Sequence, residues 1–127
     1  MKNEFVSYEI ALALKELGFK EDCFAMYRKI RSKTDESNEV SLHFFVKFNM
    51  IEDGDAKAAL YQQAFRFFRE KYRLEGAIYR LNFKWACQVF NIETSTYCFK
   101  HELFETYEEA EINSLQKMIK IVKNKSV

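Results

Sequence analysis

The sequence has no proline and only three glycines among its 127 residues. We therefore expect Asn, Asp and Ser to form the turns. Neither a G-x-G-x-x-G segment nor a P-loop occurs, which excludes the phosphate-binding loops built on glycine. No apolar run approaches the length of a membrane span. The N-terminal apolar pattern is interrupted by Glu4, Glu9 and Glu16, so we expect no signal peptide.

Excess charge and paired cysteines are also missing. The net charge is +1, so no global electrostatic field recruits nucleic acid or a membrane surface. The three cysteines, Cys23, Cys87 and Cys98, include no closely spaced pair. An odd number of isolated cysteines is typical of reduced, buried thiols, which predicts a cytoplasmic location.

The composition is that of an ordinary globular protein, with 48% hydrophobic and 31% charged residues. The length predicts a single domain over residues 1–127 that can form its own core. The chain contains 13 Phe and 7 Tyr, and such bulky aromatic residues favour strands and a thick core.

The first half of the chain predicts a helix followed by a hairpin. Apolar residues at helical spacing predict a helix over Phe5–Leu17, with a glycine after it. Cys23–Ile30 is predicted as a strand and the polar segment Ser32–Glu39 as a hairpin loop. In Val40–Phe48 apolar residues alternate with polar ones, so this strand is expected to bury Phe44.

A second helix is predicted between the two pairs of strands. It runs from Leu60 to near Arg73, with Asp53 or Asp55 as its N-cap and Gly76 beyond its end.

The second half predicts two more strands and a last helix. Alternation over Ala77–Trp85 predicts a strand that buries Phe83. A turn at Asn91–Ser95 leads to another strand, and Thr106 with Glu109 forms a capping box that starts the last helix.

These elements follow the order α-ββ-α-ββ-α and predict an α+β fold. We expect one antiparallel sheet of about four strands with the helices packed on one face. Truncating Phe44 or Phe83 to alanine should then cost roughly 3–5 kcal/mol. The tetrapeptide A-M-Y-R at Ala25 recurs as A-I-Y-R at Ala77, which leaves a duplication of the ββα unit open.

Three segments carry a resemblance to a known family. They are E-F-V-S-Y-E-I-A-L-A-L-K-E-L-G-F at Glu4, L-Y-Q-Q-A-F-R-F-F-R-E-K-Y at Leu60 and E-T-Y-E-E-A-E-I-N-S-L-Q-K-M-I-K-I-V at Glu105. Together they resemble small uncharacterised proteins of phages and prophages of gut Bacteroidetes, although Phe67 stands where many relatives have Trp. The resemblance implies a phage-related origin and a location in the host cytoplasm, and it implies no catalytic residues.

Candidate catalytic and metal-binding residues are few. Cys98 and His101 form a C-x-x-H, but on a strand an offset of three places them on opposite faces. His43 has no partner at ligand spacing, so we predict no metal site, no catalytic residue and no cofactor. The carboxylates Glu105, Glu108, Glu109 and Glu111 cluster where a helix N-terminus favours acidic residues.

The helix at Leu60 carries two candidate binding surfaces. Its wide apolar face predicts a subunit contact through Tyr61, Phe65, Phe68 and Tyr72. Its opposite face and the next strand provide candidate polyanion-binding residues, namely Arg66, Arg69, Arg73, Arg80 and Lys84. The section Ala56–Lys100 has 8 basic and 3 acidic residues, a net charge of +5. We expect Arg66 and Arg69 to be exposed whether this face binds a polyanion or is simply solvated.

The sequence therefore favours a non-catalytic binding protein of phage origin that self-associates and whose binding partner is unidentified. Binding of nucleic acid or a nucleotide through the basic residues is the alternative, and a small enzyme with an unrecognised site is the third hypothesis.

Overall fold

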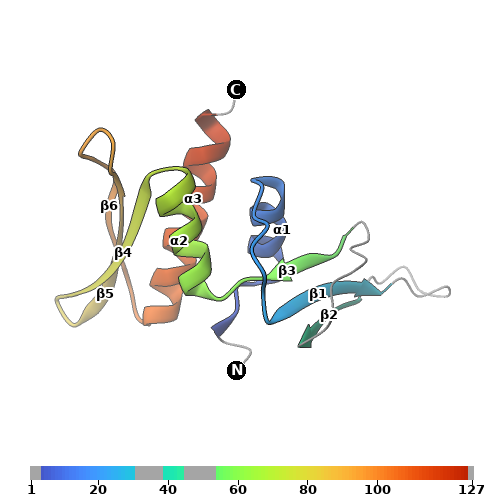
Figure 1. Ribbon diagram of the computed structural model, residues 1–127. Coiled ribbons are helices and arrows are strands. Elements are labelled where there is room, and N and C mark those ends of the chain that lie inside the picture. Colours follow the sequence, from blue (N-terminus) through green and yellow to red (C-terminus); the bar gives the residue numbers. More distant parts are fainter. Residues whose placement is uncertain (1–3, 31–38, 45–53, 126–127) are drawn as a thin grey trace. The chain divides into compact units, whose positions relative to one another are not determined.

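A computed structural model of the protein describes residues 4–30, 39–44 and 54–125. Three helices and six strands lie in these residues, and their order is α-βββ-α-βββ-α. The predicted α+β class and the antiparallel pairing are confirmed, but the strands form two three-stranded sheets instead of one sheet of about four (Figure 1). By their contacts the residues divide into two compact units, Met1–Leu60 and Tyr61–Val127, each of which is described by itself. The single domain predicted from length stays a prediction.

The first unit begins with the predicted helix. Helix α1 (Tyr8–Glu16) is shorter than the predicted span, because the Ser7 side chain caps it by accepting a hydrogen bond from the Ile10 N–H at 3.4 Å. Strands β1 (Ala25–Ile30) and β2 (Glu39–Phe44) pair in antiparallel register, which confirms the hairpin. Glu39, predicted as the last loop residue, begins β2, whereas the rest of the predicted loop and residues 45–48 of the predicted second strand lie outside the described residues.

A third strand completes the sheet of the first unit. Strand β3 (Ala56–Ala58) pairs with β1 on the side away from β2. Its three residues are too few to give an alternating pattern, so the sequence did not predict it. Phe44, which was predicted to be buried, is partly buried and packs against the Phe5 ring, with ring centroids 5.5 Å apart.

The sequence predicted Asp55 as a possible N-cap of the second helix, and this prediction is wrong. It precedes β3 and is only 2% exposed, and its carboxylate lies 3.9 Å from the Arg28 side chain. The other predicted cap, Asp53, lies outside the described residues. The short strand that separates Asp55 from the helix explains the error.

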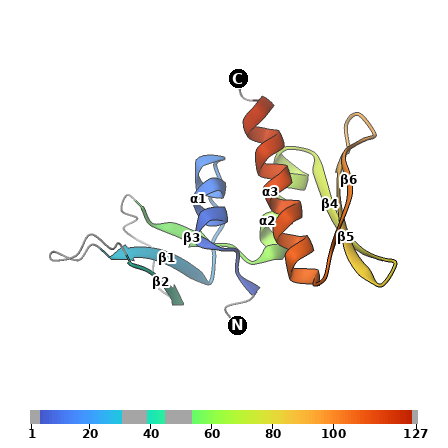
Figure 2. The same cartoon turned by 180° about the vertical axis from the view of Figure 1, so that it is seen from behind.

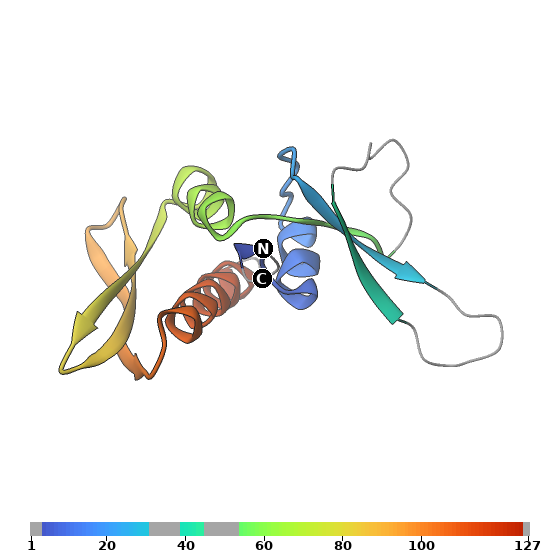
Figure 3. The same ribbon diagram turned by 90° about the horizontal axis from the view of Figure 1, so that it is seen from below.

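The second unit consists of two helices on one face of an antiparallel sheet. Helix α2 (Tyr61–Lys71) leads to strands β4 (Leu74–Leu81), β5 (Lys84–Asn91) and β6 (Thr96–Phe104), and helix α3 (Tyr107–Lys125) follows. The strand order is β4-β5-β6. The views from behind and from below both place α2 and α3 on the same side of this sheet (Figures 2 and 3).

The predicted strand Ala77–Trp85 is two strands joined by a tight turn. Asn82 and Phe83 have φ values of 50° and 66°, and the chain reverses between Leu81 and Lys84. A two-residue hairpin turn needs positive φ at both positions, which Asn tolerates and Phe rarely adopts. Phe83 is consequently 94% exposed at the tip of the hairpin, and its predicted burial is wrong.

The other predicted turn is confirmed, and so is Thr106 as the N-cap of the last helix. The predicted capping box is only half formed, because the Glu109 carboxylate accepts from the Thr106 hydroxyl and not from the Thr106 backbone N–H. Between β5 and β6 the Asn91 side-chain oxygen accepts hydrogen bonds from the Glu93 and Thr94 N–H groups at 3.0 and 3.2 Å. At the start of α3 the Glu109 N–H donates to the Thr106 hydroxyl, and that hydroxyl donates to the Glu109 carboxylate, both at 3.2 Å. The recurring tetrapeptides are not equivalent, since one lies in a central strand and the other in an edge strand.

Candidate functional site

The four aromatic residues at α2 that were predicted to form a subunit contact are buried to different degrees. Phe68 is fully buried, and Tyr61, Phe65 and Tyr72 are partly buried. Phe67, which the sequence placed outside this set, is 8% exposed and packs edge-to-face on Phe68 with centroids 5.4 Å apart. Phe67, Phe68 and Tyr72 thus contact one another within the second unit, and the subunit contact through the four predicted residues stays a prediction.

A groove lies on the helical side of the second unit. Its volume is about 470 Å³. Helix α2, strand β4 and helix α3 all contribute to it, through Gln62, Phe65, Arg66, Arg69, Gly76, Ile78, Tyr107 and Glu111. We call it the inner groove. The sequence predicted its arginines but not Tyr107 or Glu111, since nothing in the sequence places the start of the last helix beside α2.

Gly76 lets α2 and α3 approach the sheet at the inner groove. A Cβ atom at this position would lie 2.6 Å from the Phe65 ring and 2.7 Å from the Ser114 hydroxyl. Real Cβ contacts are almost never that short, so any larger residue must displace one of these neighbours. The glycine was predicted to follow the helix, and the structure shows that it serves close packing inside β4.

The structure brings together only part of the predicted polyanion-binding set. Arg66 and Arg69 are exposed, as predicted, and both line the inner groove. Arg73 lies after α2, where it adopts a φ of 56°. Lys84 forms an ion pair with Glu105 at 3.0 Å.

Arg80 lies on the same face of β4 as Ile78 of the groove, because residues two apart on a strand share a face. Its guanidinium carbon is 4.8 Å from the centroid of the Trp85 ring. Trp85 in turn packs edge-to-face on Tyr107 of the groove, with centroids 5.1 Å apart. Arg80 is therefore linked to the groove through the rings of Trp85 and Tyr107.

Glu111 is the acidic residue of the groove. Partial burial raises the pKa of its carboxyl group above the ordinary value, and the nearby carboxylate of Glu108 raises the pKa further. Its charge therefore depends on pH over a higher range than that of an exposed glutamate.

The opposite face of the β4-β5-β6 sheet carries a second candidate surface. Alternation places Tyr79, Leu81, Phe90, Tyr97 and Leu103 on the face away from the helices. Tyr97 is 51% exposed and Leu103 43% exposed, and the rings of Phe90 and Tyr97 touch edge-to-face at 5.1 Å. We call these five residues the outer face. In the sequence, apolar residues occupy both odd and even positions of Gly76–Phe90, which indicates two apolar faces. The predicted strand took only one of these faces into account.

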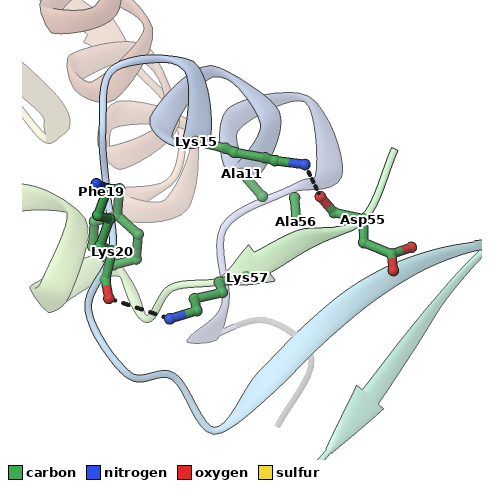
Figure 4. A pocket seen from close by; sticks show the side chains of 7 residues that line it. All are labelled: Ala11, Lys15, Phe19, Lys20, Asp55, Ala56 and Lys57. Atoms are coloured by element: carbon green, nitrogen blue, oxygen red, sulfur yellow. Dashed lines mark hydrogen bonds between the residues drawn. The ribbon is translucent and has the colours of Figure 1, made fainter. Parts of the chain in front are cut away.

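A smaller cavity of about 210 Å³ lies in the first unit (Figure 4). Three of the residues that line it are lysines. The Lys15 ammonium donates to the Asp55 carbonyl at 2.8 Å, and the Lys57 ammonium donates to the Lys20 carbonyl at 3.2 Å. These two lysines therefore stabilise the backbone around β3, and we assign the cavity a structural role.

The thiols and imidazoles do not form a site in the part of the chain that the structure describes. No group of three or more His, Cys, Asp or Glu side chains there could hold a metal ion. His43 hydrogen-bonds the Ser41 hydroxyl at 2.8 Å, and the His101 side chain lies outside the described residues. Cys87 is buried, Cys98 is exposed, and burial raises the pKa of Cys23 to about 11.

No protein-family model matches this chain, and neither a curated protein nor a solved structure is significantly similar to it. Among the described residues, none of the helices combines the length and the apolar character that crossing a bilayer requires.

Proposed function

We propose that the protein acts by binding, without catalysis of its own, and that it self-associates through the outer face of the β4-β5-β6 sheet. The observation that supports this proposal is the exposure of Tyr97 and Leu103, with Tyr79, Leu81 and Phe90 partly exposed, on the sheet face opposite the inner groove. Antiparallel sheets often leave one face to water, but that face is then usually polar. An apolar one is typical of a contact surface.

The size of the outer face fits a modest interface. Strands β4 and β5 are eight residues long. At about 3.4 Å per residue and about 4.8 Å between strands, the face measures roughly 27 by 14 Å. Its area of roughly 400 Å² is within the range of about 300–600 Å² that the largest apolar patch of a typical monomer covers, and such patches are often functional. Because stable interfaces bury about 800 Å² of accessible surface per partner, we expect weak, concentration-dependent association.

The charges around the outer face favour a second copy over a polyanion. Lys84 is already paired with Glu105. Lys100 lies over the Tyr97 ring, with its ammonium 5.1 Å from the centroid, and Glu75 lies at the other edge of the sheet. The face is therefore nearly neutral. In a two-fold arrangement, each copy would offer the other both an acidic and a basic group beside its apolar side chains.

Sedimentation velocity over a wide range of protein concentrations tests this proposal. The native chain should shift from monomer to dimer as concentration rises. Tyr97→Glu and Leu103→Glu should each shift the equilibrium toward monomer, because a carboxylate would lose its hydration in the interface. Both side chains are substantially exposed in a single copy, so the fold should tolerate the changes, which circular dichroism can verify.

Phe24→Glu is the matched control. Phe24 is 56% exposed but belongs to the first unit, so the same chemical change is made away from the outer face. A native chain that stays monomeric at every concentration would refute the proposal, and so would an equal loss of association in Tyr97→Glu and Phe24→Glu.

The resemblance to phage and prophage proteins of gut Bacteroidetes supports a further part of the proposal. We infer an origin in a phage or prophage and action in the cytoplasm of the bacterial host. The genes that flank the coding sequence test this inference, because genes of phage replication, packaging or anti-defence modules should lie beside it. A setting among unrelated housekeeping genes would contradict the phage origin.

A further inference from the structure

We propose that the inner groove binds a nucleotide unit, with the phosphate on Arg66 and Arg69 and the base against Tyr107. The groove and the outer face lie on opposite sides of the β4-β5-β6 sheet, because Gly76 and Ile78 have the opposite parity to Tyr79 and Leu81. Nucleotide binding is therefore independent of the self-association proposed above.

The two arginines provide the phosphate-binding end. Arg66 and Arg69 are three residues apart on α2, so their side chains leave the same side of the helix. Both are exposed and both line the groove. Guanidinium groups present several N–H donors in a planar array that matches phosphate oxygens, which makes a neighbouring pair of arginines a suitable phosphate clamp. Gln62, one turn earlier, adds an amide to the same wall.

Tyr107 provides the aromatic surface. It is 40% exposed, and its contact with Trp85 at an interplanar angle of 88° holds the ring in place. Arg80 covers the Trp85 ring from another side and further restricts it. A fixed, partly exposed aromatic ring beside a phosphate clamp is the arrangement on which single bases stack, whatever their sequence.

The dimensions and the charge of the groove are consistent with this ligand. A volume of about 470 Å³ is within the range of small-molecule sites and is suited to one nucleotide rather than a duplex. The residues that line the groove include two arginines and one carboxylate, so the lining itself is basic even when Glu111 is ionised. The Glu111 carboxylate can also accept a hydrogen bond from an amino group of a base, as acidic residues do from cytosine.

The source of the nucleotide unit is either a free mononucleotide or a single strand of nucleic acid. Fluorescence anisotropy and calorimetry on the full chain can distinguish them, with adenosine and cytidine monophosphates in one arm and short single-stranded oligonucleotides in the other. Similar affinity in both arms would indicate a free nucleotide, and binding in the second arm alone would indicate a strand. Absence of binding in both arms at low ionic strength would refute the proposal.

Paired variants locate the site. Arg66→Ala with Arg69→Ala should weaken binding at least tenfold and reduce its salt dependence, because fewer phosphate contacts are made. Arg73→Ala with Lys84→Ala is the matched control, since it removes the same charge from the same unit outside the groove. Equal losses in the two double variants would show that binding is spread over the basic surface and would overturn the assignment of the groove.

Tyr107→Ala and Tyr107→Phe test the base. Stacking on an aromatic ring contributes about 1–3 kcal/mol per base, so Tyr107→Ala should weaken binding about fivefold or more. Tyr107→Phe retains the ring and should bind like the native chain. Inorganic phosphate should compete only weakly, because it engages the arginines alone. If Tyr107→Ala binds like the native chain, the base does not lie on Tyr107 and this part of the proposal is wrong.

Discussion

Replacing Phe83 by glycine should stabilise the protein. Phe83 occupies the second position of a two-residue hairpin turn with a φ of 66°, and it is 94% exposed. Its ring therefore contributes almost no burial, while its Cβ atom strains the left-handed backbone. Asn-Gly is the preferred sequence for this kind of turn, and the chain has Asn82 followed by Phe83 instead.

The expected magnitude follows from two opposing effects. A left-handed conformation costs a residue with a side chain about 1–2 kcal/mol, which glycine avoids. Glycine loses more backbone entropy on folding, which costs about 0.5–1 kcal/mol. The net stabilisation should be about 0.5–1 kcal/mol. A core position, as predicted from the alternation of Ala77–Trp85, would instead make the same truncation cost about 3–5 kcal/mol.

Urea and thermal unfolding, followed by circular dichroism, measure this difference. In a unit of this size, each kcal/mol changes Tm by about 4–8 °C. Phe83→Ala separates the two effects, because it removes the ring and keeps the strained φ, so its stability should stay within about 0.5 kcal/mol of the native value. Destabilisation of several kcal/mol in both variants would mean that the Phe83 ring is buried and that the hairpin assignment is incorrect.

Two predictions concern ionisable groups. At pH 8 iodoacetamide should label exposed Cys98 first, whereas Cys23, with a pKa of about 11, has about one thiolate in a thousand, and buried Cys87 should react only on unfolding. Mass spectrometry of the labelled chain checks this order, and faster labelling of Cys23 than of Cys98 would contradict it. Glu111→Gln should unfold at higher urea concentration than the native chain at pH 7. The raised pKa of Glu111 means that the native chain loses stability as pH rises from the ordinary value of 4.5 through the folded pKa, so the difference should vanish below that range. An unfolding midpoint difference that is the same at pH 4 and pH 7 would show that ionisation of Glu111 is not its cause.

The sequence predicted the elements whose signals are local. The N-cap at Thr106 and the turn after Asn91 depend on side chains that bond to backbone groups two or three residues away. The periodicity of the first and second helices likewise comes from neighbours along the chain. These features need no knowledge of distant residues, so they could be recognised directly.

The errors arose where a local pattern had two explanations. The alternation through Phe83 is the same whether the chain continues straight or reverses in a two-residue turn, and only the pairing of Arg80 with Trp85 shows that it reverses. The turn also lacks the glycine that would have marked it. Strand β3 was missed because three residues give no detectable period.

The candidate sites were predictable only in part, for the same reason. Arg66 and Arg69 share a helix face through their spacing alone, and their exposure was predicted correctly. That they lie beside Tyr107 and Glu111 depends on α2 and α3 packing on the same face of the sheet, with Gly76 allowing the close approach.

The sequence by itself determined the α+β class, the three helices and the N-cap of the last one, because hydrophobic periodicity and capping act over a few residues. Only the tertiary structure decided which apolar face is covered. Both faces of the β4-β5-β6 strands carry large apolar side chains, and α2 and α3 can bury just one of them. The face they bury became the core and the inner groove, and the other became the exposed outer face around Tyr97 and Leu103.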